Sequence, residues 1–423
     1  MTHDNSHPAV PLPTETDVSY VRKLSLVGLS VGGIVFLVCA GIQANLSRAT
    51  WLQDSFMAYL AGFVFWAAVP IGALCLTMLA NITGASWGLV LRRIFHAYLR
   101  TWPVIALLFI PIAISLFVGG GKYSPYWWTT PDLTTLAPGN QHALEEIKLR
   151  HDDFLNPGFF LIRSIVYFTV FYLYMSWVTR TARRAEELGD EAAKIRIRYI
   201  SGPGIPFWAF VMTFMATDWV MSVESSWNST MFPVVFGLNA WIVAIASAAF
   251  LFYSIAGHNK ELMDGFIKDK FRIDIGSITY GFTMIWSYAS FCQFMLIWAG
   301  NLPEEITYYL RRKSEGWQIL TWSLVVIHWF VPFVLFLFRG IKTDPRKMRI
   351  MTTLLLCICA VDVVWWVVPA LPVHPEGSVA WLMAFAAVAA VGGAFGLGVA
   401  NQLKTRGLLP EGDAQFLKNW GHH

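Results

Sequence analysis

The sequence predicts an all-α polytopic membrane protein with about ten transmembrane helices. Hydrophobic residues make up 56% of the 423 residues, whereas Asp, Glu, Lys and Arg make up only 14%. In a soluble domain, about 25% of all residues are Asp, Glu, Lys or Arg. Most of the surface of this chain is therefore expected to contact lipid. The apolar runs are long and continuous, whereas a transmembrane barrel would show alternating segments of about ten residues. The net charge of +4, without a separate basic domain, argues against nucleic-acid binding.

The predicted transmembrane domain covers residues 21–404. Residues 1–20 are polar and proline-rich, lack the apolar segment of a cleaved signal peptide, and are expected to form a disordered cytoplasmic lead. Residues 405–423 are expected to form a cytoplasmic tail. Ten apolar runs define the spans: residues 25–44, 56–79, 101–118, 159–178, 205–223, 232–254, 275–298, 317–338, 350–370 and 379–400. Each is close to the length of about 20 helical residues that crosses a hydrocarbon core.

The distribution of Lys and Arg predicts the orientation of these spans. The connections that follow spans 2, 4, 6 and 8 contain 18 of these residues, and those that follow spans 1, 3, 5, 7 and 9 contain 7. Further basic residues close to both ends of the chain add to the first set. Because cytoplasmic connections of membrane proteins carry the excess of positive charge, both termini are expected in the cytoplasm.

Two basic connections are amphipathic. Residues Trp87–Arg100 and Glu261–Phe271 each place apolar side chains opposite Arg or Lys side chains at helical spacing. Helices of this kind lie in the headgroup plane of a membrane. Each connection is expected to be either a docking or lipid-sensing element or simply a turn between two spans.

The largest connection on the outer, periplasmic side is predicted at residues 119–156. It begins with three glycines, carries Trp127 and Trp128 in its middle, and is acidic in its later part. Asn156 followed by Pro157 is the expected N-cap and first-turn proline of the next span. A connection of this length usually has a function, and we expect it to hold a peripheral partner on the outer face.

Four ionisable side chains are predicted within the spans, where a charge costs about 3 kcal/mol or more and therefore indicates a functional candidate. Asp218 and Asp362 are expected about 20 Å from the cytoplasmic ends of their helices, at a rise of about 1.5 Å per residue. His328 is expected near the middle of its span. Arg163 is expected close enough to the outer surface for its guanidinium to reach the headgroups.

These residue types are compatible with a proton relay, because carboxyl and imidazole groups change protonation without large motions. Ser222 and Glu224 would extend the face of Asp218 toward the outer water, and Tyr288 would help to carry hydrogen-bonded water inward. Other hydroxyl side chains that could carry this water are Tyr167, Tyr172, Tyr174, Thr213, Tyr280 and Ser287. Because the inner halves of the spans contain few charged residues, the sequence favours a half-channel over a path from face to face.

A structural alternative explains the same four ionisable residues. Asp218 would form an ion pair with Arg163 on a neighbouring helix, and Asp362 would pair likewise with His328. The sequence does not give the positions of the helices relative to one another, so both interpretations stay open.

The sequence offers no ligand set for a cofactor in this chain. The five cysteines all lie within apolar runs, and none belongs to a Cys-x-x-Cys pair, so zinc or an iron–sulfur cluster is not expected. A membrane cytochrome needs pairs of histidines within its spans, whereas only His328 lies inside one. Neither a phosphate-binding loop nor a dinucleotide-binding turn is present. No catalytic, cofactor-binding or metal-ligating residue is therefore assigned to this chain.

Three segments resemble a known family of membrane subunits. They are Gly84–Arg100 (GASWGLVLRRIFHAYLR), Phe214–Phe236 (FMATDWVMSVESSWNSTMFPVVF) and Ser287–Arg312 (SYASFCQFMLIWAGNLPEEITYYLRR). In these segments, and in the number and order of its predicted helices, the chain is similar to the polysulfide-reductase membrane-anchor family (PsrC/NrfD-like). Within that family it resembles ActF, an integral membrane subunit of the bacterial alternative complex III.

The resemblance implies two four-helix bundles, helices 2–5 and helices 6–9, flanked by helices 1 and 10. It implies a place in the bacterial inner membrane, within a quinol:cytochrome c (or high-potential carrier) oxidoreductase of the respiratory chain. The implied partners are a homologous ActC-like membrane subunit, a periplasmic iron–sulfur protein, c-type cytochrome subunits, small membrane subunits and, in some bacteria, a terminal oxidase. Haem c and iron–sulfur clusters would belong to those partners.

The chain departs from the family in one respect. Members of the family handle quinol near the outer face of the first bundle with a histidine and an acidic residue, and here that bundle offers Asp218 but no histidine within a span. The principal quinol site is therefore expected in the ActC-like subunit. The expected function of this chain is scaffolding, together with a proton half-channel coupled to quinol oxidation.

Two other functions are alternatives. In the first, the chain itself binds and oxidises quinol in an outer pocket near Asp218, Arg163 and the loop that carries Trp127 and Trp128. In the second, the chain is a stand-alone secondary transporter, which would require broken helices in corresponding positions of two repeats.

Overall fold

The computed structural model describes residues 17–46, 49–129, 145, 148, 154–187, 190–224, 227–256, 269–313, 316–370, 379–404 and 408. Over these residues the protein is almost entirely helical and has no strand, which confirms the predicted all-α class. Most of the predicted outer loop, the connection at residues 257–268, the lead up to residue 16 and most of the tail lie outside the described residues.

The long helices account for most of the described chain. They are α1 (Ser19–Leu46), α2 (Trp51–Thr83), α7 (Pro157–Glu187), α8 (Glu191–Trp219), α9 (Phe232–Ile255), α10 (Asp269–Gly300), α15 (Pro345–Val367) and α16 (Ala380–Leu403). The shorter helices are α3 (Ser86–Arg100), α4 (Trp102–Leu108), α5 (Ile110–Ser115), α11 (Pro303–Arg311), α12 (Trp317–Ser323), α13 (Val331–Leu335) and α14 (Arg339–Thr343). A π-helical stretch, η7 (Leu324–Phe330), joins α12 to α13, and 3-10 turns occur at η1 (Val118–Gly121), η2 (Trp127–Thr129), η4 (Met221–Val223) and η8 (Val368–Ala370).

Nine helical segments within the described residues are long and apolar enough to cross a membrane, so the chain is a multi-pass membrane protein as predicted. A tenth crossing results if α3 counts together with α4 and α5, which follow it after a bend of 40°. Pro103 lies in the first turn of α4, where it has no N–H to donate to the carbonyl of Leu99 and therefore interrupts the helix. The third predicted span, residues 101–118, is thus the second half of a bent segment.

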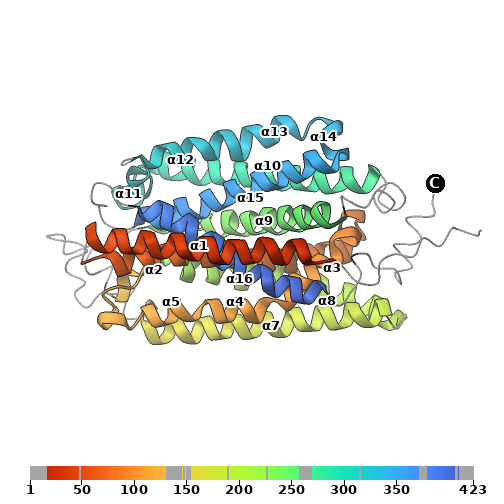
Figure 1. Cartoon of the computed structure of the whole chain (residues 1–423), viewed down its shortest axis with the longest axis horizontal. Coiled ribbons are helices and arrows are strands. Elements are labelled where there is room, and N and C mark those ends of the chain that lie inside the picture. The colour runs from red at the N-terminus through yellow and green to blue at the C-terminus, as the bar shows by residue number, and fades with distance from the viewer. Residues whose placement is uncertain are drawn as a thin grey trace, which may run out of the picture.

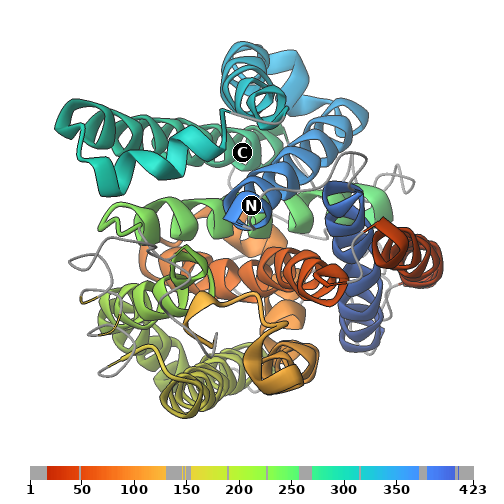
Figure 2. The same ribbon diagram turned by 90° about the vertical axis from the view of Figure 1, so that its left-hand side faces the viewer.

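The helices form two groups that meet along α2 and α9 (Figure 1, Figure 2). In the first group, α2 packs against α8 and against α4 and α5, and α7 packs against α8. In the second group, α9 packs against α10 and α15, and the segment from α12 to α13 lies against these two helices. Helices α1 and α16 form a flanking pair beside α2. This arrangement agrees with the expected two bundles and two flanking helices.

Close contact between α2 and α9 joins the two groups. A Cβ atom at Gly72 would overlap the carbonyl oxygen of Ala240, so the two backbones approach as closely as glycine allows. The most apolar part of each helix is 83% buried within the protein. Helices that are apolar all round occupy the centre of a large bundle, and α2 and α9 form that centre here.

Helices α1 and α16 run antiparallel. The backbone of Gly393 lies against Ser25, and that of Gly32 lies against Ala386 and Ala390, so residue numbers rise along one helix as they fall along the other. The described chain therefore begins and ends at the same end of the bundle. This end also contains α3 and α14 (Figure 1) with their Arg and Lys side chains, and we call it the basic end. The opposite end, with α5 and α11, is called the far end.

The predicted start of the fifth span is wrong. Helix α8 begins at Glu191 rather than near residue 205, because Pro203 and Pro206 are accommodated inside it. Asp190 caps the first turn, since its Oδ1 accepts a hydrogen bond from Ala193 N at 3.1 Å. Asp218 consequently lies in the last turn of α8, about 40 Å from the start of the helix rather than 20 Å.

The apolar face of Trp87–Arg100 does not contact lipid, as a helix in the headgroup plane would require. Within α3, the apolar side chains of Leu91, Ile94 and Tyr98 are at most 1% exposed. They pack against protein, because α3 lies over α2, α9 and α10 at the basic end. The apolar face that suggested contact with lipid is therefore used in helix packing. Most of the second amphipathic connection, Glu261–Phe271, lies outside the described residues.

Candidate functional site

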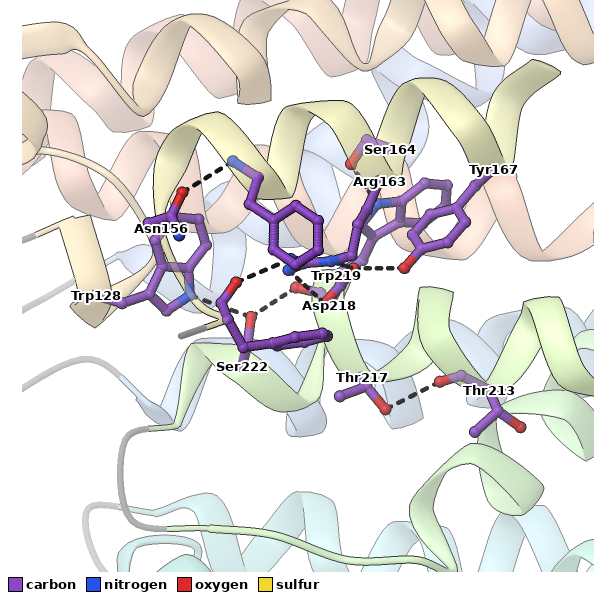
Figure 3. Close-up of polar contacts among 12 residues, drawn as sticks. Trp128, Asn156, Arg163, Ser164, Tyr167, Thr213, Thr217, Asp218, Trp219 and Ser222 are labelled. Atoms are coloured by element: carbon purple, nitrogen blue, oxygen red, sulfur yellow. Dashed lines mark hydrogen bonds and ion pairs between the residues drawn. The ribbon is translucent and has the colours of Figure 1, made fainter. Parts of the chain in front are cut away.

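A buried ion pair joins α7 to α8 near the far end of the first group (Figure 3). Arg163 donates from Nε to Asp218 Oδ2 at 2.7 Å and from Nη2 to Asp218 Oδ1 at 3.0 Å. Tyr167, one turn further along α7, donates its hydroxyl to the same Oδ2 at 2.7 Å. The side chain of Asp218 is fully buried and that of Arg163 is 9% exposed. This ion pair, one of the two pairs of the structural alternative, is confirmed.

Arg163 points into the protein, and the prediction that it reaches the headgroups is wrong. Its Nη1 donates to the carbonyl of Phe154 at 2.8 Å, and its guanidinium carbon lies 3.8 Å from the ring centre of Phe154 and 4.4 Å from that of Phe159. The reason is the buried carboxylate on α8, which a guanidinium can satisfy with two parallel hydrogen bonds.

Aromatic side chains near η2 cover this ion pair. Trp128 Nε1 donates to Ser222 Oγ at 3.4 Å, and Ser222 Oγ donates to the carbonyl of Asp218 at 2.6 Å (Figure 3). Tyr126 stacks on Trp128 with ring centres 5.0 Å apart, and its hydroxyl donates to the carbonyl of Trp219 at 3.2 Å. Burial first, and the charge of Asp218 second, raise the pKa of Tyr126, so this hydroxyl remains a donor. The first part of the predicted outer loop therefore closes over Asp218 from the far end.

Glu224 does not extend the face of Asp218. Its Oε1 instead accepts a hydrogen bond from Arg311 Nη1 of α11 at 2.7 Å, in an ion pair where the Glu224 side chain is 3% exposed. Arg312, the next residue, is 1% exposed and donates to three backbone carbonyls of α11 and α15 at 2.7 to 2.9 Å. Glu224 thus belongs to the second group, because the chain turns at η4 before it reaches this residue.

A second buried cluster surrounds Asp362 of α15. This residue is 2% exposed and lies about 25 Å along its helix, which begins at Pro345 rather than near residue 350. Its Oδ2 accepts hydrogen bonds from Asn239 Nδ2 of α9 at 3.0 Å and from Trp286 Nε1 of α10 at 3.1 Å. Both donors are neutral side chains.

His328 contacts this cluster through Trp286. The two rings stack with centres 3.6 Å apart, and His328 Nε2 lies 3.6 Å from the sulfur of Cys359. The predicted pairing of His328 with Asp362 is therefore wrong. The reason is that the indole of Trp286 contacts both residues, with its N–H on the carboxyl and its face on the imidazole.

The backbone at His328 is π-helical. Pro332 follows four residues later and has no N–H, so the carbonyl of His328 cannot receive the usual helical hydrogen bond from that position. The wider stretch η7 ends directly before the helix that contains this proline. Stretches of this kind are frequent at functional sites.

Four buried polar atoms around the second cluster have no hydrogen-bond partner within the described part of the chain. They are Glu224 Oε2, Asn239 Oδ1, Tyr308 Oη and His328 Nδ1. Tyr308 of α11 lies close enough to Glu224 and Asp362 for both charges to act on it, and burial raises its pKa, so its hydroxyl stays protonated. Buried polar atoms are normally hydrogen-bonded, often to ordered water. A water molecule hydrogen-bonded to any of these four atoms would satisfy it.

Most of the predicted hydroxyl side chains do not join either cluster. Tyr288 is 70% exposed on α10, so it lies on the outside of the bundle. Thr213 and Ser287 donate to backbone carbonyls three or four residues earlier on their own helices. Of these hydroxyl groups, that of Tyr167 contacts a buried carboxylate.

Several members of the second cluster were not singled out in the sequence. Asn239 had a recognisable signal, because it is the one amide side chain in the apolar run 232–254. Trp286 and Cys359 had no such signal in the sequence, since both are ordinary apolar residues of a predicted span. Tyr308 and Arg312 lie outside the predicted spans, where a polar or charged residue is unremarkable.

Titratable side chains do not gather into a metal-binding group in the described ranges. No set of three or more His, Cys, Asp or Glu residues there lies close enough together to hold an ion. In comparisons with known proteins, no family model and no curated protein matches this chain.

Proposed function

We propose that this chain is a membrane subunit of a quinol:cytochrome c oxidoreductase of the alternative complex III type, in which it acts as a scaffold and provides a proton half-channel. The similarity of three segments to ActF supports the place in the complex. The buried carboxyl of Asp362, with two neutral hydrogen-bond donors, is the observation that supports proton transfer. In this proposal the ActC-like subunit holds the quinol, and the cytochrome and iron–sulfur partners carry the electrons.

A proton carrier must alternate between two protonation states at small cost. Asp362 is better suited to this than Asp218, because its donors, Asn239 and Trp286, are neutral and no paired cation is left behind when the carboxyl takes up a proton. Protonation of Asp218 would instead leave Arg163 as a buried cation without a counterion. Asp362 is therefore the proposed proton-carrying group, and the Arg163–Asp218 pair is proposed to stabilise the packing of α7 against α8.

The proposed half-channel begins at the far end of the second group. Arg311 is 44% exposed there and pairs with the buried Glu224. Water bound at Glu224 Oε2 and at the hydroxyl of Tyr308 would connect this end to Asp362. His328 follows beyond Trp286, and its buried Nδ1 has no hydrogen-bond partner among the described residues, so water could extend the path there. With the orientation expected from the sequence, the far end faces the outer side of a bacterial inner membrane and both termini face the cytoplasm.

The assignment to a complex is tested by purification of the tagged chain from its native membranes in mild detergent. Mass spectrometry and a haem spectrum of the eluate identify the partners. The expected result is an eluate with c-type cytochromes, an iron–sulfur protein and an ActC-like membrane subunit. A chain that elutes alone, stable and without haem, would contradict the proposal and make a secondary transporter the next function to test. A quinone bound to this chain within the complex would instead favour direct quinol oxidation.

A further inference from the structure

A second, unrelated feature of the structure lies at the basic end of the first group. A pocket of about 310 Å³ opens where the C-terminal parts of α7 and α16 meet the bend between α3 and α4. Three arginines line it: Arg100 at the end of α3, and Arg180 and Arg183 on α7. We propose that this pocket binds the phosphate of an anionic phospholipid.

The chemistry of the lining matches a phosphate group. A guanidinium presents two parallel N–H donors to phosphate oxygens, which makes arginine the preferred side chain for phosphate in a fixed geometry. The hydroxyls of Ser176 and Thr179 and the amide of Gln402 also line the pocket, and none of its described lining residues is acidic. The pocket therefore combines positive charge with several additional polar groups.

The helical register places these groups on one face of α7. Tyr172, Ser176, Thr179, Arg180 and Arg183 are spaced by three or four residues, or are direct neighbours, so they form a stripe along the helix. The stripe is about 16 Å long. Helix α7 has 31 residues and at about 46 Å exceeds the hydrocarbon core of about 30 Å. Its arginine-bearing end therefore projects to headgroup depth, whereas Tyr172 lies deeper in the bilayer.

Apolar surface continues from the pocket toward the middle of the membrane. Leu173 and Trp177 on α7 are 61% and 48% exposed, and Leu107 on α4 is 64% exposed. Leu99 and Pro103 form apolar parts of the pocket wall. An acyl chain can lie along this surface while its phosphate contacts the arginines, and a Trp at interfacial depth is typical of lipid contact. A free phosphate ion offers the same anionic oxygens but would leave the apolar surface unused.

The test is a titration of the full protein, as purified from membranes, with phosphatidylglycerol in detergent, with bound lipid counted by native mass spectrometry. Arg180→Gln combined with Arg183→Gln removes two guanidinium groups from the pocket. Arg346→Gln combined with Arg349→Gln is the matched control, because it removes the same charge from the basic end outside the pocket. Arg180→Lys combined with Arg183→Lys keeps the charge and removes only the forked geometry.

The wild-type protein and the control are expected to bind one phosphatidylglycerol with equal affinity, and the glutamine pair to bind it about tenfold more weakly. The lysine pair should lie between them, and it keeps the test decisive if the glutamine pair fails to fold. Equal affinity in all four proteins would overturn the site. An equal loss of affinity in the control would show that lipid binding depends only on general surface charge, and this result would also contradict the proposed site. Displacement of the lipid by millimolar inorganic phosphate would assign the pocket to a soluble anion and contradict the lipid.

Discussion

Asp218 and Asp362 are both at most 2% exposed, yet they receive different hydrogen bonds. Asp218 is held by the guanidinium of Arg163 and the hydroxyl of Tyr167, whereas Asp362 is held by an amide and an indole. A buried carboxylate next to a cation is stabilised in its charged form, because loss of either charge leaves the other without compensation. The same residue type therefore has a structural role on α8 and a proposed proton-carrying role on α15.

Replacement of Asp218 by Asn should destabilise the protein strongly. The variant leaves the guanidinium of Arg163 buried without a counterion, a change that typically costs about 3–5 kcal/mol. Tyr167→Phe, which removes one hydrogen bond and no charge, is the milder comparison and should cost about 1–3 kcal/mol. Thermal unfolding in detergent measures both. An Asp218→Asn variant as stable as Tyr167→Phe would show that the ion pair does not stabilise the packing of α7 against α8.

At the scale of the elements, the sequence predicted the existence of the helices better than their ends. Pro203 and Pro206 suggested a boundary near residue 205, but α8 continues through both of them. The apolar face of α3 suggested contact with lipid, and the structure packs it against α2, α9 and α10 instead. Both errors have the same physical origin. Contacts with neighbouring helices decide whether a proline is tolerated and what covers an apolar face, and those contacts are not encoded locally.

The contact between α2 and α9 should be sensitive to a single methyl group. Gly72→Ala introduces a Cβ that overlaps the carbonyl of Ala240, so the two central helices must separate. Overpacking of this kind usually costs about 1–3 kcal/mol. Gly33→Ala on α1 is the control, because nothing lies within 4 Å of a Cβ at that position. The thermal midpoint should fall for Gly72→Ala alone; equal midpoints would show that α2 and α9 can separate without loss of packing energy.

At the scale of the whole molecule, the burial of the polar groups was predictable from the sequence, whereas their depth along the helices and one of the two predicted pairings were not. Asp218, Asp362 and His328 stood out as polar groups within apolar runs. Arg163, the partner of Asp218, comes from the preceding helix α7, whereas Asn239 and Trp286, the partners of Asp362, come from α9 and α10, far away in the chain. The packing of α9, α10 and α15 within the second group brings Asn239 and Trp286, rather than His328, to the carboxyl of Asp362, which is why the pairing of His328 with Asp362 was predicted wrongly.

The antiparallel packing of α1 and α16 predicts that both ends of the chain lie on one side of the membrane. This requires an even number of crossings, so the bent segment from α3 to α5 must count as one crossing. Tags at the two termini should both be accessible to an impermeant label in inside-out vesicles and both protected in right-side-out cells. Tags on opposite sides would show that the segment from α3 to α5 enters and leaves the membrane by the same face.

The proton-carrying role of Asp362 is tested most directly by the number of protons released per electron, measured with the purified complex in reconstituted vesicles. Asp362→Asn should lower this ratio with unchanged subunit content, because the amide keeps the size and polarity of the side chain but cannot exchange a proton. Asp362→Glu, which keeps a carboxyl group, should restore much of the ratio. A wild-type ratio in the Asp362→Asn complex would contradict the proposed half-channel through α9, α10 and α15.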